Sequence, residues 1–245
     1  MKDQVSKGRV RKWEERNKRY ESEEKSVQPT RKATFVLTVK NTLDLLGEVN
    51  RGKLLDIGCG FGEIDLLLSQ YTDFEITGCD ISETALDNAR QNIKKAGLGS
   101  EIKIEKADVY NFHYPDDYFD VILSTGYVSA ATYPGVQKEV ARVLKPEGIL
   151  VCDFINHLSL YKILKAGFRI LKTGQIPPYF SFKRICQTFG EYGLVCKDQR
   201  IFNTYPPLDI IFSSENYLNF EKTFGKIFSP VLGRVRLVKF EKKKK

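Results

Sequence analysis

The feature that most constrains this chain is a short apolar stretch that runs into three glycines at alternate positions. It reads Leu54-Leu55-Asp56-Ile57-Gly58-Cys59-Gly60-Phe61-Gly62. Glycine has no Cβ, so it adopts positive φ easily and lets a ligand approach the main chain. Residues 63–70 can form a helix, whose first amides are free to donate hydrogen bonds to a polar or anionic group. The stretch therefore predicts a strand, a ligand-binding turn and a helix.

The spacing of the glycines narrows the kind of ligand. The pattern is G-x-G-x-G with Asp56 two residues before the first glycine, whereas the dinucleotide-binding fingerprint is G-x-G-x-x-G. No G-x-x-x-x-G-K-[ST] segment occurs in the chain, which excludes a phosphate-binding P-loop. Glycine-rich turns serve several cofactors, so the motif alone identifies none of them.

Strands and helices alternate along the chain. Short apolar-rich segments bounded by turn residues predict strands at 53–57, 74–79, 102–106, 119–124, 148–154, 194–202 and 234–240. Helical spacing of apolar residues predicts helices at 33–46, 83–96, 158–172 and 183–192. Because parallel strands need crossover helices, this order predicts an α/β fold with a parallel sheet covered on both faces. Ligands of such sheets bind beyond the carboxyl ends of the strands.

Length and composition exclude several classes of protein. At 245 residues the chain is long enough for one α/β domain with additions and too short for two large domains. No stretch approaches the roughly 18 apolar residues that span a bilayer, and the first residues lack the apolar region of a signal peptide. We therefore expect a cytoplasmic protein, or one peripheral to a membrane. The five cysteines form no cluster of zinc-like spacing, so we expect no metal site.

The positive net charge of +8 is unevenly distributed. Residues 1–32 contain 11 Lys and Arg against 6 Asp and Glu, residues 33–153 contain 11 against 19, and residues 154–245 contain 17 against 6. The middle of the chain is acidic and both ends are basic. Such asymmetry favours an anionic partner for the ends, either RNA, a lipid surface or an acidic small molecule. A solvated basic surface explains it as well, because charge alone specifies no ligand.

Two further acids stand where the second and third strands end. Asp80 follows the strand at 74–79, and an acid at this place in a doubly wound fold can accept hydrogen bonds from both ribose hydroxyls. Asp108 follows the third strand, where its carboxylate can accept from an adenine amino group while Val109 packs on the ring. Each acid singly can instead cap a helix or a turn. Jointly with Asp56 they favour a nucleoside-containing cofactor.

Four segments, in this order, resemble the class I S-adenosylmethionine-dependent methyltransferases, in particular the broad branch that includes ubiquinone- and menaquinone-type enzymes. They are residues 54–62, Gly78-Cys79-Asp80-Ile81-Ser82, Ala107-Asp108 leading to Pro115-Asp116-Asp117-Tyr118-Phe119-Asp120-Val121-Ile122, and Val140-Ala141-Arg142-Val143-Leu144-Lys145-Pro146-Glu147-Gly148. The resemblance covers residues 50–155. One departure is Glu147, where the family usually has a second glycine.

The resemblance implies a Rossmann-like, doubly wound sheet of seven strands, mostly parallel, with the last strand antiparallel and inserted between the fifth and sixth. It implies S-adenosylmethionine as the cofactor. The first acid and the glycines would hold the methionine part, the second acid the ribose, and the third acid with its following valine the adenine. The residues expected to bind the cofactor are Asp56, Gly58, Cys59, Gly60, Gly62, Asp80, Ile81, Asp108, Val109 and Ser124.

No catalytic residue is identified by a motif. Methyl transfer from a sulfonium is an in-line displacement that depends mainly on positioning, and a base is needed only if the acceptor must lose a proton. Residues 124–127 read Ser-Thr-Gly-Tyr, neither the Asn/Asp-Pro-Pro-Tyr/Phe of exocyclic-amine enzymes nor the Pro-Cys of cytosine-C5 enzymes. His157 is the best candidate base, since imidazole titrates near neutral pH; a solvent histidine at a helix start is the alternative. Tyr127 either borders the acceptor or packs in the core.

Residues 158–172 predict a strongly amphipathic, basic helix. At 100° per residue its bases fall within about 80° of one another, with apolar side chains opposite; the bases are Lys162, Lys165, Arg169 and Lys172. Such a helix can lie on an anionic membrane surface, act as a lid over an acceptor pocket, or pack as an ordinary surface helix. Aromatic residues at 180, 182, 202 and 205 favour an apolar or aromatic acceptor over a sugar.

These observations predict a charged N-terminal arm, residues 1–32, before a methyltransferase domain, residues 33–245. Within the domain we expect a cofactor half, residues 50–155, and an acceptor-side lid with C-terminal strands, residues 156–245. The expected activity is methylation of a small, hydrophobic or anionic molecule. The alternatives are a tRNA or rRNA methyltransferase, which the basic ends favour, and a non-catalytic module that keeps the cofactor fold for binding.

Overall fold

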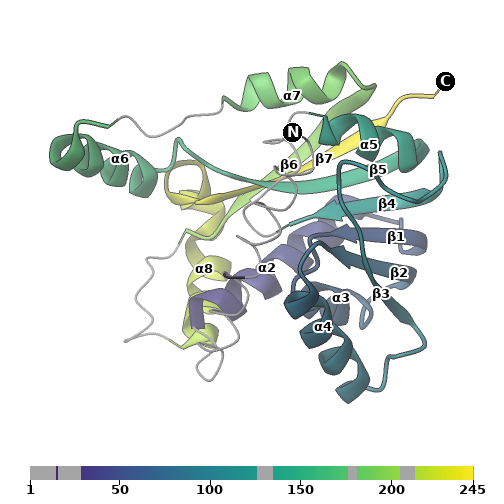
Figure 1. The fold of residues 1–245 in the computed structure, drawn as a ribbon. Helices are drawn as coiled ribbons and strands as arrows, with labels where there is room; N and C mark the ends of the chain where they lie inside the picture. The colour runs from purple at the N-terminus through teal and green to yellow at the C-terminus, as the bar shows by residue number, and fades with distance from the viewer. Residues whose placement is uncertain (1–14, 16–28, 126–134, 176–180, 205–212, 245) are drawn as a thin grey trace.

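The strands form one seven-stranded sheet in the order β3-β2-β1-β4-β5-β7-β6 (Figure 1). The computed structural model describes residues 15, 29–125, 135–175, 181–204 and 213–244. The strands are β1 (Arg51–Ile57), β2 (Asp73–Asp80), β3 (Ile102–Lys106), β4 (Phe119–Ser124), β5 (Leu144–Ile155), β6 (Leu194–Phe202) and β7 (Val235–Lys242). β7 is antiparallel to β5 and β6, and the other neighbours are parallel. The predicted mostly parallel sheet, with its antiparallel last strand between the fifth and sixth, is confirmed.

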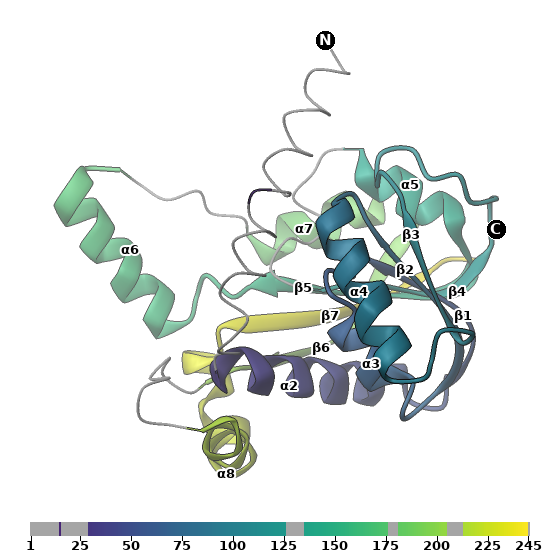
Figure 2. The same ribbon diagram turned by 60° about the horizontal axis from the view of Figure 1, so that its bottom comes forward.

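Helices cover both faces of the sheet, as Figures 1 and 2 show. They are α2 (Pro29–Leu46), α3 (Glu63–Leu68), α4 (Glu83–Lys95), α5 (Val136–Val143), α6 (Leu160–Thr173), α7 (Phe182–Gly190) and α8 (Ser214–Leu232). Helices α2, α3, α4 and α8 contribute to the apolar core on one face, and α5 and α7 contribute to the core on the other. This is the doubly wound arrangement that the order of elements predicted.

Strand β5 shows why both faces are covered. Side chains alternate between the two faces of a strand. Leu150 and Cys152 lie in the core with α5 and α7, whereas Ile149 and Val151 lie in the core with α2 and α3. All four are at most 5% exposed, so the strand reads as a continuous apolar run, typical of a buried parallel sheet.

Some element boundaries differ from those expected. β5 begins at Leu144 rather than at residue 148, and within it Glu147 has a φ of 62°. That left-handed conformation explains why the family usually has glycine at this position. α2 begins at Pro29 rather than at residue 33, because proline is tolerated in the first turn of a helix. α6 begins at Leu160 because Ser159 caps it, its hydroxyl accepting a hydrogen bond from the Lys162 amide.

Helix α8 was not predicted from the sequence. Its apolar residues nevertheless follow helical spacing at positions 217, 220, 224, 227, 228 and 231, a signal that would have found it. Gly225 and Pro230 lie inside the helix and interrupt that pattern. Pro230 lies near the carboxyl end, where α8 is about to stop.

Most of the predicted N-terminal arm lies outside the described residues. So do Tyr127, Phe180 and Tyr205. The division into an arm, a cofactor half and an acceptor side therefore stays a prediction. Residues 29–32 belong to α2, whose buried Ala33 and Leu37 pack in the core.

Candidate functional site

The glycine turn, residues 58–62, connects β1 to α3. Gly58, Gly60 and Gly62 have φ angles of 78°, 58° and 78°, a region that disfavours side chains with a Cβ. A Cβ on Gly58 or Gly60 would meet no atom within 4 Å, so the backbone conformation, not crowding, requires glycine there. The open space leaves the main chain accessible to a ligand. The carbonyl of Cys79 accepts a hydrogen bond from the Gly58 amide at 2.7 Å, which fixes the turn against β2.

Asp80 at the end of β2 is joined to the same turn. Its Oδ2 accepts a hydrogen bond from the Gly60 amide at 3.3 Å, and its Oδ1 accepts one from the Ser82 amide at 2.9 Å. Ser82 in turn caps α4, its hydroxyl accepting from the Ala85 amide at 3.2 Å. Ile81 lies half-buried between them. The carboxylate is thus oriented by backbone amides at the carboxyl edge of the sheet.

Asp108 lies beyond the end of β3, next to Asp80. The Ala107 amide donates to the Asp80 carbonyl at 3.2 Å, so the two strand ends are neighbours. Asp108 Oδ1 accepts a hydrogen bond from the Tyr110 amide at 3.1 Å, which orders the loop. Val109 packs against the apolar core. The structure therefore brings the predicted adenine-side residues to the same edge as the glycine turn.

Asp56 at the end of β1 is paired with a second buried acid, Asp65 of α3. Their exposed fractions are 2% and 0%. Asp56 Oδ1 and both carboxylate oxygens of Asp65 accept no hydrogen bond from the other described groups, and the two carboxyls lie within reach of a shared proton. Burial, and next the charge of Asp65, raise the pKa of Asp56 well above its usual value. Burial raises the pKa of Asp65 to about 7.

Asp65 was not identified from the sequence. Its signal is an acid between Ile64 and Leu68, on the side of α3 that packs against the core. A buried acid without a basic partner is unusual, because burial strongly disfavours its charge. It strengthens the negative potential beneath Asp56.

The edge fits a ligand with a positive charge and a nucleoside. The unsatisfied Asp56 oxygen can accept a hydrogen bond from a cationic group, which would also relieve the repulsion between the buried acids. The open glycine turn permits a close approach, and Asp80 and Asp108 provide acceptors farther along. Cys59 and Ser124 are buried beside this edge.

Arg31 of α2 is a further residue near the turn that was not predicted. Its guanidinium forms an ion pair with Glu63, with a distance of 2.7 Å between Nη2 and Oε1. It also lies over the rings of Phe35 and Phe61, 5.2 and 5.8 Å from their centroids. Arg31 thereby holds α2 across the start of α3, next to the glycine turn.

His157, the candidate base, lies between β5 and α6 and is half-buried. Burial and the nearby charge of Lys162 lower its pKa, which keeps the imidazole neutral at physiological pH. Its position after β5 places it on the carboxyl side of the sheet. Tyr127, the second candidate, lies outside the described ranges.

A buried polar network fixes α8 to the end of β6. The carboxylate of Glu221 accepts hydrogen bonds from the amides of Asn203 and Thr204, at 3.0 and 2.9 Å, and from the Thr204 hydroxyl at 2.7 Å. Asn203 donates to Thr34 of α2 at 3.1 Å, and Arg234 donates to the Asn203 side chain at 3.0 Å. The end of β6 is therefore joined to α2 and α8 by polar contacts.

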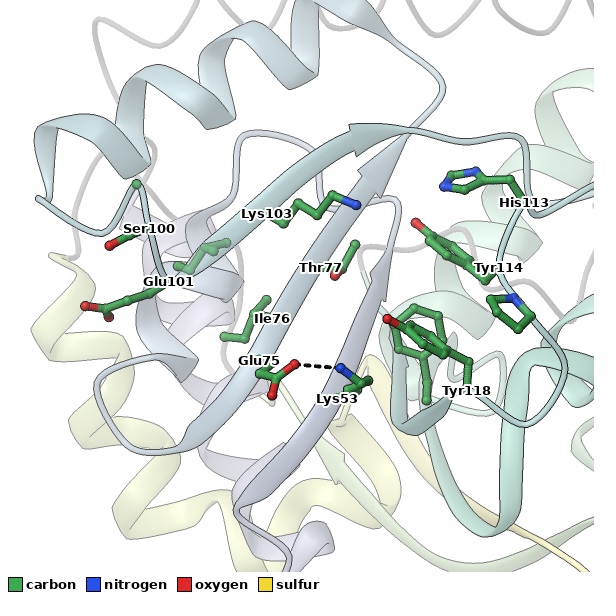
Figure 3. A pocket seen from close by; sticks show the side chains of 14 residues that line it. Lys53, Glu75, Ile76, Thr77, Ser100, Glu101, Lys103, His113, Tyr114 and Tyr118 are labelled. Carbon is green, nitrogen blue, oxygen red and sulfur yellow. Dashed lines mark hydrogen bonds and ion pairs between the residues drawn. The ribbon is translucent and has the colours of Figure 1, made fainter.

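A cavity of about 620 Å³ lies away from this edge, at the amino ends of β1 to β4. Figure 3 shows Lys53 paired with Glu75 in this cavity, with Tyr118, Tyr114 and His113 to the right of the pair. It contains none of the residues predicted to bind the cofactor.

Among the described residues, no group of three His, Cys, Asp or Glu side chains is arranged to hold a metal ion. No described helix is long and apolar enough to cross a membrane.

The sheet order, the glycine turn and the acids at successive strand ends define a class I S-adenosylmethionine-dependent methyltransferase, and the chain belongs to that family. Residues 54–148 match the methyltransferase domain family. The demethylmenaquinone methyltransferase of Geobacillus kaustophilus is 30% identical over 192 residues, which cover 72% of this chain and 77% of that enzyme. S-adenosylmethionine is the cofactor of the family.

Other similarities are more local or show the fold alone. The sterol 24-C-methyltransferase of Neurospora crassa is 35% identical over 97 residues, covering 39% of this chain and 26% of that enzyme. The chain spans between 26% and 46% of the length of several curated relatives that it matches. A structure of geranyl diphosphate methyltransferase in complex with SAM superposes with a TM-score of 0.58 at 15% identity, covering 84% of each chain.

Proposed function

We propose that this protein transfers a methyl group from S-adenosylmethionine to a small, hydrophobic or anionic molecule. The observation that supports the proposal is the hydrogen bond that joins Asp80 to the glycine turn, because a carboxylate that can accept from ribose hydroxyls then lies beside main chain that a ligand can touch. When bound, the cofactor supplies an electrophilic methyl group on a sulfonium. Relatives named for menaquinone and sterol methylation support a hydrophobic acceptor.

The proposed cofactor contacts follow the strand ends. Asp56 and the amides of the glycine turn hold the methionine part, Asp80 the ribose, and Asp108 with Val109 the adenine. Cys59, Ile81 and Ser124 line the same edge. A positive charge beside Asp56 would stabilise the ionised carboxylate that burial disfavours, so this edge favours a cationic ligand group over a neutral one.

Catalysis needs little beyond alignment. Holding acceptor and methyl group in line can supply about 7 to 11 kcal/mol. Where the acceptor must lose a proton, we propose His157 as the base, which would add on the order of 10²- to 10⁴-fold. The lowered pKa of His157 supports this role, since a base must be unprotonated to act.

The acceptor side supports a hydrophobic or anionic substrate by its composition. Residues 154–245 contain 17 Lys and Arg against 6 Asp and Glu, and exposed apolar side chains concentrate in α6 and α8. A protein with this fold is named geranyl diphosphate methyltransferase, and geranyl diphosphate is both hydrophobic and anionic. The same basic charge is the observation that favours RNA as the second candidate acceptor.

A labelled-methyl transfer assay on cell extract tests the proposal. After incubation, the extract is separated into lipid, small-molecule and RNA fractions, with Asp80→Ala as the inactive control. We expect label in the lipid or small-molecule fraction. Label in RNA alone would show a tRNA or rRNA methyltransferase instead. Cofactor binding without transfer to any fraction would show a non-catalytic binding module.

A further inference from the structure

Helix α6 is an unusual helix because none of its residues is buried. Its large apolar side chains are all exposed, and Leu171 reaches 88%; they are Leu160, Tyr161, Ile163, Leu164, Phe168, Ile170 and Leu171. A helix of this length is marginal in water unless an apolar face is packed. Monomeric proteins rarely expose an apolar surface this continuous unless it binds something.

Most of the apolar face of α6 points away from the rest of the described structure; Tyr161, at its border, lies under the Arg234 guanidinium, 5.5 Å from ring centroid to Cζ. Lys162 and Ala166 are its half-buried positions, and α6 contacts α8. At 100° per residue, the apolar side chains occupy about half of the circumference, opposite these two positions. Figures 1 and 2 both show α6 projecting beyond the body of the molecule.

The charge of α6 is entirely positive. The helix contains four bases, Lys162, Lys165, Arg169 and Lys172, and no acid. Lys165, Arg169 and Lys172 are exposed along one border of the apolar face. A basic border beside an exposed apolar face complements a surface that is apolar within and anionic outside, which describes an anionic lipid bilayer. RNA would not explain the leucines and isoleucines.

Helix α8 adds a second exposed apolar stripe next to α6. Phe224, Ile227, Phe228 and Val231 are all exposed and follow the i, i+3, i+4, i+7 spacing of one helix face. Because α8 contacts α6 and is fixed by Glu221 to the end of β6, the stripe is held to the body of the protein.

We propose that α6 and the exposed stripe of α8 form a docking surface for an anionic lipid bilayer. The apolar side chains enter the boundary between headgroups and acyl chains, and the bases contact the headgroups. α6 follows directly after β5, so docking places the carboxyl edge of the sheet close to the membrane. The closeness of this edge to the membrane would give a hydrophobic acceptor a route to the site, an inference that rests on the proposed function. The docking of α6 and α8 to the bilayer does not rest on it.

Vesicle sedimentation with the full chain tests the docking surface. Vesicles are made of phosphatidylcholine alone or of equal parts phosphatidylcholine and phosphatidylglycerol. A base close to an anionic surface strengthens binding about fivefold, so we expect at least tenfold tighter binding to the anionic vesicles. The preference should weaken as salt concentration rises.

Three variants locate the surface. One carries Leu164→Gln, Phe168→Gln and Leu171→Gln, and another carries Lys165→Glu, Arg169→Glu and Lys172→Glu. We expect each to lose at least tenfold in vesicle affinity while its Tm and its calorimetric affinity for S-adenosylmethionine stay unchanged. The matched control reverses three exposed lysines elsewhere, Lys94→Glu, Lys95→Glu and Lys138→Glu, and should keep most of the binding.

Several outcomes would overturn the proposal. They are absence of vesicle binding by the natural chain, equal binding to neutral and anionic vesicles, and equal loss in the control. A dimer in light scattering that the glutamine variant dissociates would assign the face to a second copy, and competition by RNA alone would assign it to RNA. Intact cofactor binding together with failed docking would leave the proposed function standing.

Discussion

The cofactor edge and helix α6 handle charge in opposite ways. At the edge, Asp56 and Asp65 are buried together without a basic partner, whereas in α6 three of the four bases are exposed and no residue is buried. A buried charge depends on its immediate neighbours, so each residue there has an individual effect. Exposed charges act through their summed field and are screened. Single substitutions should therefore affect the edge strongly and α6 hardly at all.

The largest expected effect concerns a second buried carboxylate, Glu221 of α8, which lies outside the cofactor edge. Glu221→Ala removes the acceptor of three hydrogen bonds and leaves buried donors unsatisfied. Such losses sum to about 4 kcal/mol, which lowers the Tm of a protein of this size by about 10 °C. Differential scanning calorimetry measures it. The exposed neighbour Lys222→Ala should change the Tm little, and equal effects would contradict the role of the network.

At the cofactor edge, Asp80→Ala should weaken cofactor binding. Two hydrogen bonds to a charged group contribute about 3 kcal/mol, so affinity for S-adenosylhomocysteine should fall by roughly 100-fold. Isothermal titration calorimetry measures the change. Asp87→Ala, an exposed acid on α4, is the control. Unchanged affinity in the Asp80 variant would remove the ribose contact from the proposal.

Asp65→Asn tests the buried acid pair through its pH dependence. The folded-state pKa of Asp65, about 7, lies above the ordinary 3.8, so the protonated carboxyl stabilises the fold at low pH. This contribution is fully present below about pH 4 and is lost as pH rises through about 7. Asparagine cannot ionise, so the Tm of the variant relative to the natural chain should rise by at least about 3 °C from pH 5 to pH 8.

The control for this pair is Asp73→Asn, an exposed acid at the start of β2. Its Tm difference from the natural chain should stay constant across the same pH range. If the Asp65 variant behaved in the same way, the two buried carboxyls would not share a proton in solution.

The smallest effect is expected in α6. Leu171→Ser replaces an apolar side chain that is 88% exposed, and such surface substitutions change stability by about 0.5 kcal/mol or less. The Tm should therefore stay within about 2 °C of the natural value. A drop of more than about 5 °C would mean that α6 packs against the body of the protein in solution and that its side chains are not as exposed as described.

The glycine turn and the strands beside it could be predicted from the sequence because their signals are local. Residues 54–62 specify strand, turn and helix within one short segment, and Asp80 and Asp108 follow strands that apolar runs mark clearly. The sheet order was predicted from the family resemblance, and the structure confirms it. The proposed contacts of these residues with the cofactor stay predictions.

The features that were missed depend on tertiary contacts. In the sequence, Asp65 and Glu221 cannot be distinguished from exposed helical acids. Asp65 is buried only when α3 packs on the core, and Glu221 only when α8 meets the end of β6. α8 was missed because Gly225 and Pro230 interrupt its pattern. The early start of β5 was missed because Glu147 must adopt a left-handed conformation there, which an isolated glutamate does not favour.

The place of β7 in the sheet has a consequence for the newly made chain. β7 is the only strand of the sheet with which β6 pairs, and β5 gains its second partner only when residues 235–242 are added. During translation, β6 is therefore synthesised before the strand that pairs with it. Until then both β5 and β6 present bare edges, the kind of surface that chaperones cover and that aggregates recruit.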